Sequence, residues 1–326
     1  MRIPATSLSL ALGVALTAAA QQHPPRTVVE HVIPRARNFP HDPAVGADGI
    51  VWYTDQVNSY IGRLDPATGV ITDTPTPTPH SGPHGIEVAP DGAVWYTGQT
   101  AGVLGRLDPK TMAITEYPLP DIAKNPHTPI AHRGQIWFTD ANNNTYGRLD
   151  PATGKVDVWE VPVPGSIPYG MRSAPDGSIW IAHLGTNMLG HVNSTTGQFT
   201  PVQLPHPGAR PRRLAVTPDG KVWYTDNARG FLGMLDPATG KVREWASPSG
   251  ADSGPYGIAI GTDGRLWYNE QSSNLMVAFD PTTEKMETVK IPSGNAVVRH
   301  MVTDVARKRL WLALSGSGRI GMIDLK

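Results

Sequence analysis

Short apolar segments alternate with polar turns along the chain, and a tryptophan recurs at the centre of one such segment in every repeat. DGIVWYTD at residues 48–55 returns as DGAVWYTG at 91–98 and as DGKVWYTD at 219–226. Seven tryptophans follow one another at intervals of 42 to 44 residues, namely Trp52, Trp95, Trp137, Trp180, Trp223, Trp267 and Trp311. A period of this length, rich in strand-forming residues, is typical of β-propellers that have one blade per repeat.

Each repeat contains four short strand-like segments. A segment that follows Pro-x-Gly, such as HGIEVAP at 84–90, leads through an Asp-Gly turn into the tryptophan segment. A third segment, such as LGRLDP at 104–109, and a fourth, such as VDVWEVP at 156–162, complete the repeat. Asp-Gly and proline-containing turns are those that antiparallel hairpins require. The sequence therefore predicts an all-β, seven-bladed β-propeller with four antiparallel strands per blade and with the tryptophans packed between blades.

The two ends of the repeat region complement each other. Residues 27–34 (TVVEHVIP) resemble a fourth strand without a blade before it, and the chain ends at RIGMIDLK, a third strand without a fourth after it. We expect residues 27–33 to pair with residues 319–325 as the outer strand of the seventh blade. This pairing closes the ring and removes two exposed strand edges.

The first twenty residues differ from the rest. Arg2 precedes a mostly apolar run from Leu8 to Leu16, and the small residues 18–20 follow it. This order is typical of a cleaved signal peptide, and the run is too short to span a bilayer. We expect residues 1–20 to be the signal peptide, residues 21–326 to be the propeller, and the protein to be secreted or periplasmic without a membrane span.

The amino-acid composition limits the classes of partner that the protein is expected to bind. The chain has 28 Lys and Arg against 28 Asp and Glu, and it contains no cysteine. A nucleic-acid partner is not expected, because such partners need a clustered basic surface. The pattern specifies no oligomeric state.

A candidate site follows from the start of each first strand, where the repeat varies among ionisable and aromatic residues. These positions are His41, His84, His127, Tyr169, Arg212, Tyr256 and His300. Equal steps from the Asp-Gly turn place them opposite the ends of the second strands, at Asp55, Gly98, Asp140, His183, Asp226, Glu270 and Leu314. Positions that escape the scaffold pattern of a repeat protein usually carry its site. We therefore expect a small-molecule substrate or ligand at this mouth of the central channel.

Imidazole groups suit a divalent transition-metal ion, and carboxylates can bind such an ion or orient the imidazoles. The predicted metal ligands are His41, His84, His127, His300, Asp55 and Asp140. Simpler alternatives stay open at this point. The histidines could bond to neighbouring backbone, Arg212 could form an ordinary ion pair with Asp226, and the tyrosines could only cap the channel.

The recurring P-[HY]-G-I, D-G-x-[VIL]-W-[YF]-T-[DE] and I-G-R-[LI] elements resemble the virginiamycin B lyase family over residues 27–326. The resemblance implies magnesium-dependent opening of a cyclic depsipeptide by elimination at an ester bond. It matches the general-base histidine to His300 and the second active-site histidine to Tyr256. The two metal-binding acids of the family pattern are replaced by Val298 and by Leu314 or Ser315, so linearisation of streptogramin B antibiotics is not expected.

These observations predict a metal-assisted lyase or lactonase-type enzyme acting on a small or cyclic ester-like substrate. Its expected catalytic residues are His300, His84, Tyr256 and Arg212. The alternatives are a non-catalytic propeller that binds a ligand or a protein, and a transition-metal redox site on the histidines.

Overall fold

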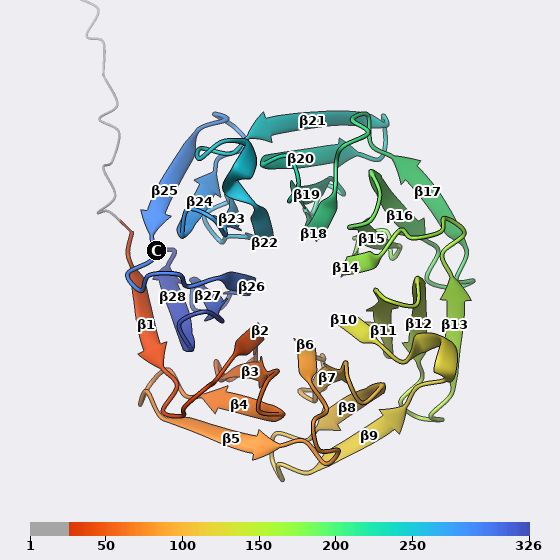
Figure 1. The fold of residues 1–326 in the computed structure, drawn as a ribbon, viewed down its shortest axis with the longest axis vertical. Coiled ribbons are helices and arrows are strands. Elements are labelled where there is room, and N and C mark those ends of the chain that lie inside the picture. Colours follow the sequence, from red (N-terminus) through yellow and green to blue (C-terminus); the bar gives the residue numbers. More distant parts are fainter. Residues whose placement is uncertain (1–25) are drawn as a thin grey trace, which may run out of the picture.

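A computed structural model describes residues 26–326, so the predicted signal peptide at residues 1–20 lies outside the described part. Seven four-stranded antiparallel sheets surround a common axis, as Figure 1 shows, which confirms the predicted fold. In each blade the inner strand faces the axis and the fourth strand forms the outer wall. Two short 3₁₀ helices, η1 (Asp121–Ala123) and η2 (Ala251–Ser253), lie in connections between blades.

The strands follow the chain order blade by blade. Blade 1 contains β2 (Pro40–Val45), β3 (Val51–Asp55), β4 (Tyr60–Leu64) and β5 (Ile71–Pro75). Blade 2 contains β6 (Pro83–Val88), β7 (Val94–Gly98), β8 (Val103–Leu107) and β9 (Ile114–Pro118). Blade 3 contains β10 (Pro126–His132), β11 (Gln135–Asp140), β12 (Thr145–Leu149) and β13 (Val156–Glu160). Blade 4 contains β14 (Pro168–Ser173), β15 (Ile179–His183), β16 (Met188–Val192) and β17 (Phe199–Gln203).

The later blades repeat this order. Blade 5 contains β18 (Pro211–Val216), β19 (Val222–Asp226), β20 (Phe231–Asp236) and β21 (Lys241–Ala246). Blade 6 contains β22 (Pro255–Ile260), β23 (Leu266–Glu270), β24 (Leu275–Phe279) and β25 (Met286–Lys290). Blade 7 contains β26 (Val298–Asp304), β27 (Arg309–Leu314), β28 (Arg319–Asp324) and β1 (Val28–Val32).

Strand β1 closes the ring as predicted. It pairs antiparallel with β28, from Val28 opposite Ile323 to Val32 opposite Arg319. The Glu30 carboxylate also accepts a hydrogen bond of 2.9 Å from the backbone N–H of Ser293, which follows β25 of blade 6. The N-terminal strand therefore ties the last blade to its neighbour as well as completing it.

The core consists of apolar layers between adjacent blades. All seven repeat tryptophans are buried, which confirms their structural role. Trp95 of blade 2, for example, packs with Ile136 and Phe138 of blade 3. Trp137 also stacks on Trp159 of its own outer strand at 5.6 Å between ring centroids. Burying a large side chain contributes about 1.5–3 kcal/mol, so these layers are the main source of stability.

A β-bulge near the start of each inner strand shifts the predicted register. Pro83 pairs with Gly98, but Ile86 pairs with Tyr96, so three steps on β6 oppose two on β7. The expected pairing of His84 with Gly98 is therefore wrong by one residue, because equal counting from the turn leaves no room for the bulge.

The same register corrects the alignment of blade 7. Val298 pairs with Leu314, so Arg299 occupies the position of His84 and His300 stands one residue further along its strand.

A belt of side-chain to backbone hydrogen bonds joins blades around the axis. The hydroxyl of Thr54 on β3 donates to the carbonyl of His84 on β6 at 2.7 Å, and it accepts from the N–H of Asp42 at 3.1 Å. Equivalent side chains that bond to the next blade are Thr97, Thr139, Thr225 and Asn269. In blades 1, 2, 3 and 5 the threonine of the W-[YF]-T motif thus fixes the height at which the next inner strand begins.

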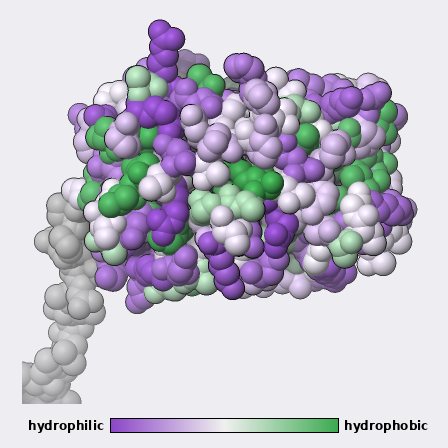
Figure 2. Space-filling view, turned by 90° about the horizontal axis from the view of Figure 1, so that it is seen from below, coloured by the Kyte–Doolittle hydropathy of each residue, from purple (hydrophilic) through white to green (hydrophobic). Residues whose placement is uncertain are grey.

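Seen edge-on, the outer wall is mainly hydrophilic with small separated apolar patches (Figure 2). Among residues 26–326 no helix is long and apolar enough to cross a membrane.

Candidate functional site

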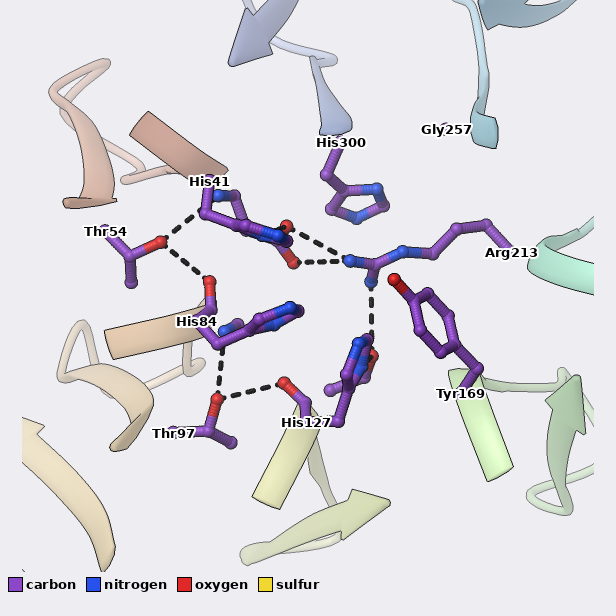
Figure 3. A network of polar contacts seen from close by, with 12 residues as sticks. His41, Thr54, His84, Thr97, His127, Tyr169, Arg213, Gly257 and His300 are labelled. Atoms are coloured by element: carbon purple, nitrogen blue, oxygen red, sulfur yellow. Dashed lines mark hydrogen bonds and ion pairs between the residues drawn. The ribbon is translucent and has the colours of Figure 1, made fainter. Parts of the chain in front are cut away.

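Aromatic side chains from four consecutive inner strands form an arc around the axis (Figure 3). The ring centroids of His41 and His84 are 3.7 Å apart, those of His84 and His127 are 4.0 Å apart, and those of His127 and Tyr169 are 3.8 Å apart. All four side chains are buried. The structure therefore brings the three predicted histidines of blades 1 to 3 together near the axis.

Inside this arc lies an ion pair that the sequence analysis missed. One terminal nitrogen of Arg213, from blade 5, reaches the two carboxylate oxygens of Asp42, from blade 1, at 3.0 and 3.1 Å. The other terminal nitrogen donates to the hydroxyl of Thr128 in blade 3 at 3.2 Å. Both charged side chains are only 2% exposed. This pair crosses the axis and links three blades that are far apart in sequence.

The residues of this pair directly follow the predicted site residues His41 and Arg212 in the sequence, and the repeat shows a pattern at that position. The inner strands have glycine there in blades 2, 4 and 6, and a Cβ at Gly85 would come within 2.5 Å of the carbonyl oxygen of His127. In the other blades the residues are Asp42, Thr128, Arg213 and His300. These four replacements of glycine place polar groups at the centre of the ring.

Asp42 orients the ring of His41. Its Oδ1 lies 2.9 Å from Nδ1 of His41. Burial would raise the pKa of Asp42, but the guanidinium of Arg213 and the neighbouring histidines hold it well below its usual range. Because the carboxylate is ionised, Nδ1 of His41 carries the proton and its Nε2 carries the lone pair. Such a carboxylate–imidazole arrangement is the one that general-base histidines use.

The histidines of the cluster are neutral at pH 7. Burial lowers the pKa of His41 against the opposing attraction of Asp42. Burial lowers the pKa of His84 still further, with the neighbouring imidazoles of His127 and His41 adding to the effect. For His127 and His300 the causes are burial and then the positive charge of Arg213. Neutral imidazoles can accept a proton or bind a ligand without first losing one.

His300 has a different environment from the other three histidines. Its Nε2 lies 2.8 Å from a guanidinium nitrogen of Arg172, and its Nδ1 is enclosed without a hydrogen-bond partner among residues 26–326. Since arginine can only donate, Nε2 of His300 is the acceptor and its lone pair is occupied. His300 therefore lies in the cluster, but in this arrangement it has no free lone pair to act as a base.

Tyr169, Tyr256 and Arg212 complete the ring. The two tyrosine oxygens are 2.5 Å apart, and the guanidinium carbon of Arg212 lies 3.7 Å from the ring centroid of Tyr256. Burial opposes ionisation of Tyr256, but the positive charges of Arg212 and Arg213 outweigh it and lower the pKa of this phenol. Burial and the neighbouring Tyr256 raise the pKa of Tyr169. The phenol of Tyr256, beside the positive charges of Arg212 and Arg213, is therefore the more acidic of the two.

The remaining predicted residues lie outside the cluster. Asp55 accepts hydrogen bonds from the N–H groups of Phe39 and Asn58 and forms an ion pair with Arg35. Asp140 accepts from the N–H groups of Asn125 and Asn143 at 2.7 and 2.9 Å. Both carboxylates stabilise the loops that lead into and out of their blades.

His183 and Arg212 also differ from expectation. The ring of His183 meets Phe199 of its own outer strand edge-on at 5.4 Å. Asp226 pairs with Arg229 at 2.7 Å, whereas Arg212 donates to Asn227 at 3.2 Å and to the hydroxyl of Tyr169 at 3.3 Å. The alternative of an Arg212–Asp226 pair is therefore wrong.

The donor groups do not fit the magnesium ion that the resemblance implies. Mg²⁺ prefers an octahedron of oxygen ligands. In the described residues, three side chains with metal-ligand atoms within 4.8 Å of one another are His41, Asp42 and His84, and they offer one carboxylate. Arg213 bonds to both oxygens of that carboxylate, and Val298 and Leu314 are buried apolar residues. We therefore derive no chemical step through a metal ion.

Comparison with known proteins gives a consistent family. A model described as the virginiamycin B lyase family matches residues 18–152 and 129–326. Virginiamycin B lyase from Staphylococcus aureus is 25% identical, with a TM-score of 0.85 over 92% of this chain and 100% of that one. A streptogramin B lyase structure is 24% identical, also with a TM-score of 0.85, over 92% of this chain and 98% of that one.

More distant propellers share the fold alone. Hydrazine synthase from Kuenenia stuttgartiensis has a TM-score of 0.74 at 14% identity, over 90% of this chain and 97% of that one. No curated protein sequence matches the chain.

Proposed function

Because this chain belongs to the virginiamycin B lyase family, we propose that it opens a small ester-like substrate by elimination, with His41 as the base. The observation that supports this proposal most directly is the bond between Asp42 and Nδ1 of His41, which leaves Nε2 of a neutral imidazole with its lone pair. His41 belongs to the arc of rings where the inner strands begin, so a substrate would approach from this face of the ring.

The chemical step needs no water. Nε2 of His41 takes the proton from the carbon next to a carbonyl group, and the electron pair left behind forms a carbon–carbon double bond. The neighbouring carbon–oxygen bond breaks, and its electrons leave with the carboxylate of the former ester. Asp42 stabilises the imidazolium that forms, as the carboxylate of a catalytic triad does. A positioned base of this kind contributes about 10²–10⁴-fold to the rate.

Negative charge develops on the carbonyl oxygen as the proton leaves. A family member with a bound divalent ion would stabilise that charge through the metal. In this chain the groups that carry positive charge near the axis are guanidiniums, among them those of Arg212, Arg213 and Arg299. Fixed positive groups in a buried site stabilise a developing anion without reorganisation. We therefore propose chemistry that proceeds without added magnesium.

The test uses the full chain with chelator present and a threonine amide whose hydroxyl is acylated. Elimination gives an unsaturated amide and a free carboxylic acid, whereas hydrolysis restores the threonine hydroxyl, and mass spectrometry separates the two outcomes. We expect the elimination product, a loss of at least about 100-fold in kcat for His41→Gln, and an unchanged rate for the exposed control His206→Gln. A streptogramin B antibiotic should remain cyclic in the same assay.

Two results would reject the proposal. Hydrolysis in place of elimination would assign the site to lactonase-type chemistry, and an active His41→Gln variant would remove His41 as the base. The absence of turnover on a panel of such esters, with a ligand still bound at the ring, would favour the non-catalytic binding propeller.

A further inference from the structure

Three guanidiniums around the axis form no salt bridge with a carboxylate among residues 26–326, although the charge of Arg172 acts on the buried carboxyl group of Glu87. Arg213 forms its ion pair with Asp42. Arg172, Arg212 and Arg299 form no salt bridge with any carboxylate in residues 26–326, and their hydrogen bonds go to neutral groups where they have any. Each of the three is half-buried. Half-buried positive charges without a counter-ion are costly, so this part of the ring has an excess of positive charge that an anion would neutralise.

Two of these arginines flank the same tyrosine. The guanidinium carbon of Arg212 lies 3.7 Å from the ring centroid of Tyr256, and that of Arg299 lies 5.9 Å from it. Arg299 also lies 5.5 Å from the ring of Phe39. Among the described residues Arg299 donates no side-chain hydrogen bond, whereas Arg212 donates to Asn227 and to the hydroxyl of Tyr169. Blades 5, 6 and 7 thus present two guanidiniums beside aromatic rings, and the terminal N–H groups of Arg299 are unused.

The positive charges of Arg212 and Arg213 act on the phenol of Tyr256. A buried phenol ordinarily resists ionisation, yet the arginines lower the pKa of Tyr256 despite its complete burial. This is the direction expected where positive charge exceeds negative charge.

Apolar side chains lie beside the two tyrosines of the ring. Ala141 follows β11 and Leu184 follows β15, so both lie at the face where the inner strands begin. They form a small cluster with Tyr169 and Tyr256, in which Leu184 is only partly buried. An arginine pair beside an apolar surface matches a ligand that has a charged group at one end and an apolar body at the other.

We propose that this face binds an organic carboxylate, with the carboxylate between Arg212 and Arg299 and the apolar body toward Ala141 and Leu184. Guanidinium groups bind carboxylates through paired N–H···O bonds, and Arg299 has unused terminal N–H groups for such bonds while Arg212 adds a second positive charge. The proposal rests on the proposed function for the location of the substrate site, and it adds the class of substrate, an acid.

Calorimetric titration of the full chain with benzoate tests the proposal. Benzamide, the neutral analogue of the same shape, and inorganic phosphate, an anion without an apolar body, are the two comparison ligands. We expect benzoate to bind, and benzamide and phosphate to bind at least about tenfold more weakly, since each lacks one of the two recognised features. Equal binding of benzoate and benzamide, or tighter binding of phosphate, would overturn the proposal.

Variants locate the site. Arg212→Gln and Arg299→Gln should each weaken benzoate binding by about tenfold or more. The exposed Arg37, in the loop before β2, is a matched control, and Arg37→Gln should bind as the parent does. If circular dichroism shows that Arg212→Gln does not fold, Arg212→Lys replaces it. Lysine keeps the positive charge but lacks the paired N–H groups of a guanidinium, so this variant should still bind benzoate more weakly. Unchanged binding in the folded arginine variants would overturn the assignment.

The same titration separates this proposal from the proposed function. The His41→Gln variant should bind benzoate normally even though it is expected to be inactive. If the parent protein binds benzoate but does not convert the ester substrates, only the lyase proposal is rejected. If it converts ester substrates without preferring those that carry an acid, only the carboxylate site is rejected.

Discussion

Replacement of Asp42 by Asn should destabilise the protein far more than an ordinary loss of a hydrogen bond. The change keeps the size and shape of the side chain but removes its charge. Asp42 now accepts from the guanidinium of Arg213 and from Nδ1 of His41, and the pair is 2% exposed on both sides. An asparagine oxygen at the Oδ1 position could still accept from both donors, but the neutral amide would not balance the charge of Arg213, and its NH₂ group would face the guanidinium in place of Oδ2.

The expected magnitude follows from the charge left behind. Removing one partner of a buried ion pair typically costs about 3–5 kcal/mol, because the other charge stays buried without compensation. Arg213 then keeps hydrogen bonds to neutral oxygens alone, one of which is the hydroxyl of Thr128. Thr128→Val removes that bond from a charged donor and should cost about 1.5–3 kcal/mol. We therefore expect Asp42→Asn to lose about 3–5 kcal/mol of unfolding free energy, more than Thr128→Val loses.

Urea denaturation followed by tryptophan fluorescence at pH 7.5 measures these differences. A double variant, Asp42→Asn with Arg213→Met, removes both charges and should be within about 2 kcal/mol of the parent, since a hydrophobic replacement of a buried pair is often nearly neutral. Two results would refute this reasoning: a loss of less than about 1 kcal/mol of unfolding free energy in Asp42→Asn, or a loss in the double variant equal to the sum of the two single changes. Either result would show that Asp42 and Arg213 do not stabilise each other as a buried ion pair.

Two further predictions concern the ring and its pH dependence. Deletion of residues 1–35 removes β1 and exposes the edge of β28, so the thermal midpoint should fall, and an unchanged midpoint would contradict closure by β1. Burial raises the pKa of Glu87 to about 7 against the pull of Arg172. The folded state therefore holds this proton more tightly than the unfolded chain, and the parent should lose about 1–2 kcal/mol between about pH 5 and pH 8. In urea titrations at these two pH values, Glu87→Gln should lose less unfolding free energy than the parent does. Equal losses in the two proteins would show that another group is responsible.

The architecture was predictable because it is repeated. One tryptophan per repeat, preceded by an Asp-Gly turn in five of the seven repeats, defines the blade, and each further copy confirms the period. The closing strand was predictable for the same reason, since a fourth strand lacked a blade at one end and a blade lacked a fourth strand at the other. Repetition also explains the error in register, because a bulge present in every blade leaves no irregularity in the sequence to reveal it.

The site was predictable only in part. The positions of His41, His84 and His127 followed from their place in the repeat, and the structure brings them together. The partner across the axis could not be found by counting, because Asp42 and Arg213 are 171 residues apart and their contact depends on side-chain length and direction. Asp55 was assigned to a metal because it ends a strand beside the axis, but the loop N–H groups around it determine its role.

The belt of threonine bonds also shows where this ring can be divided. At the equivalent position in blade 4 the residue is Ala182, which has no hydroxyl to bond to the carbonyl of Arg212. Blade 7 has Ala313 there, but Ser315 bonds to the carbonyl of Pro40 and spans that junction instead. The junction between blades 4 and 5 is therefore the natural place for a split-protein reporter. Two fragments separated in the loop before β18 would reassemble without a threonine bond at this junction, through its apolar layer and through the pairing of β1 with β28, and they would bring Arg212 back to the ring only when they did.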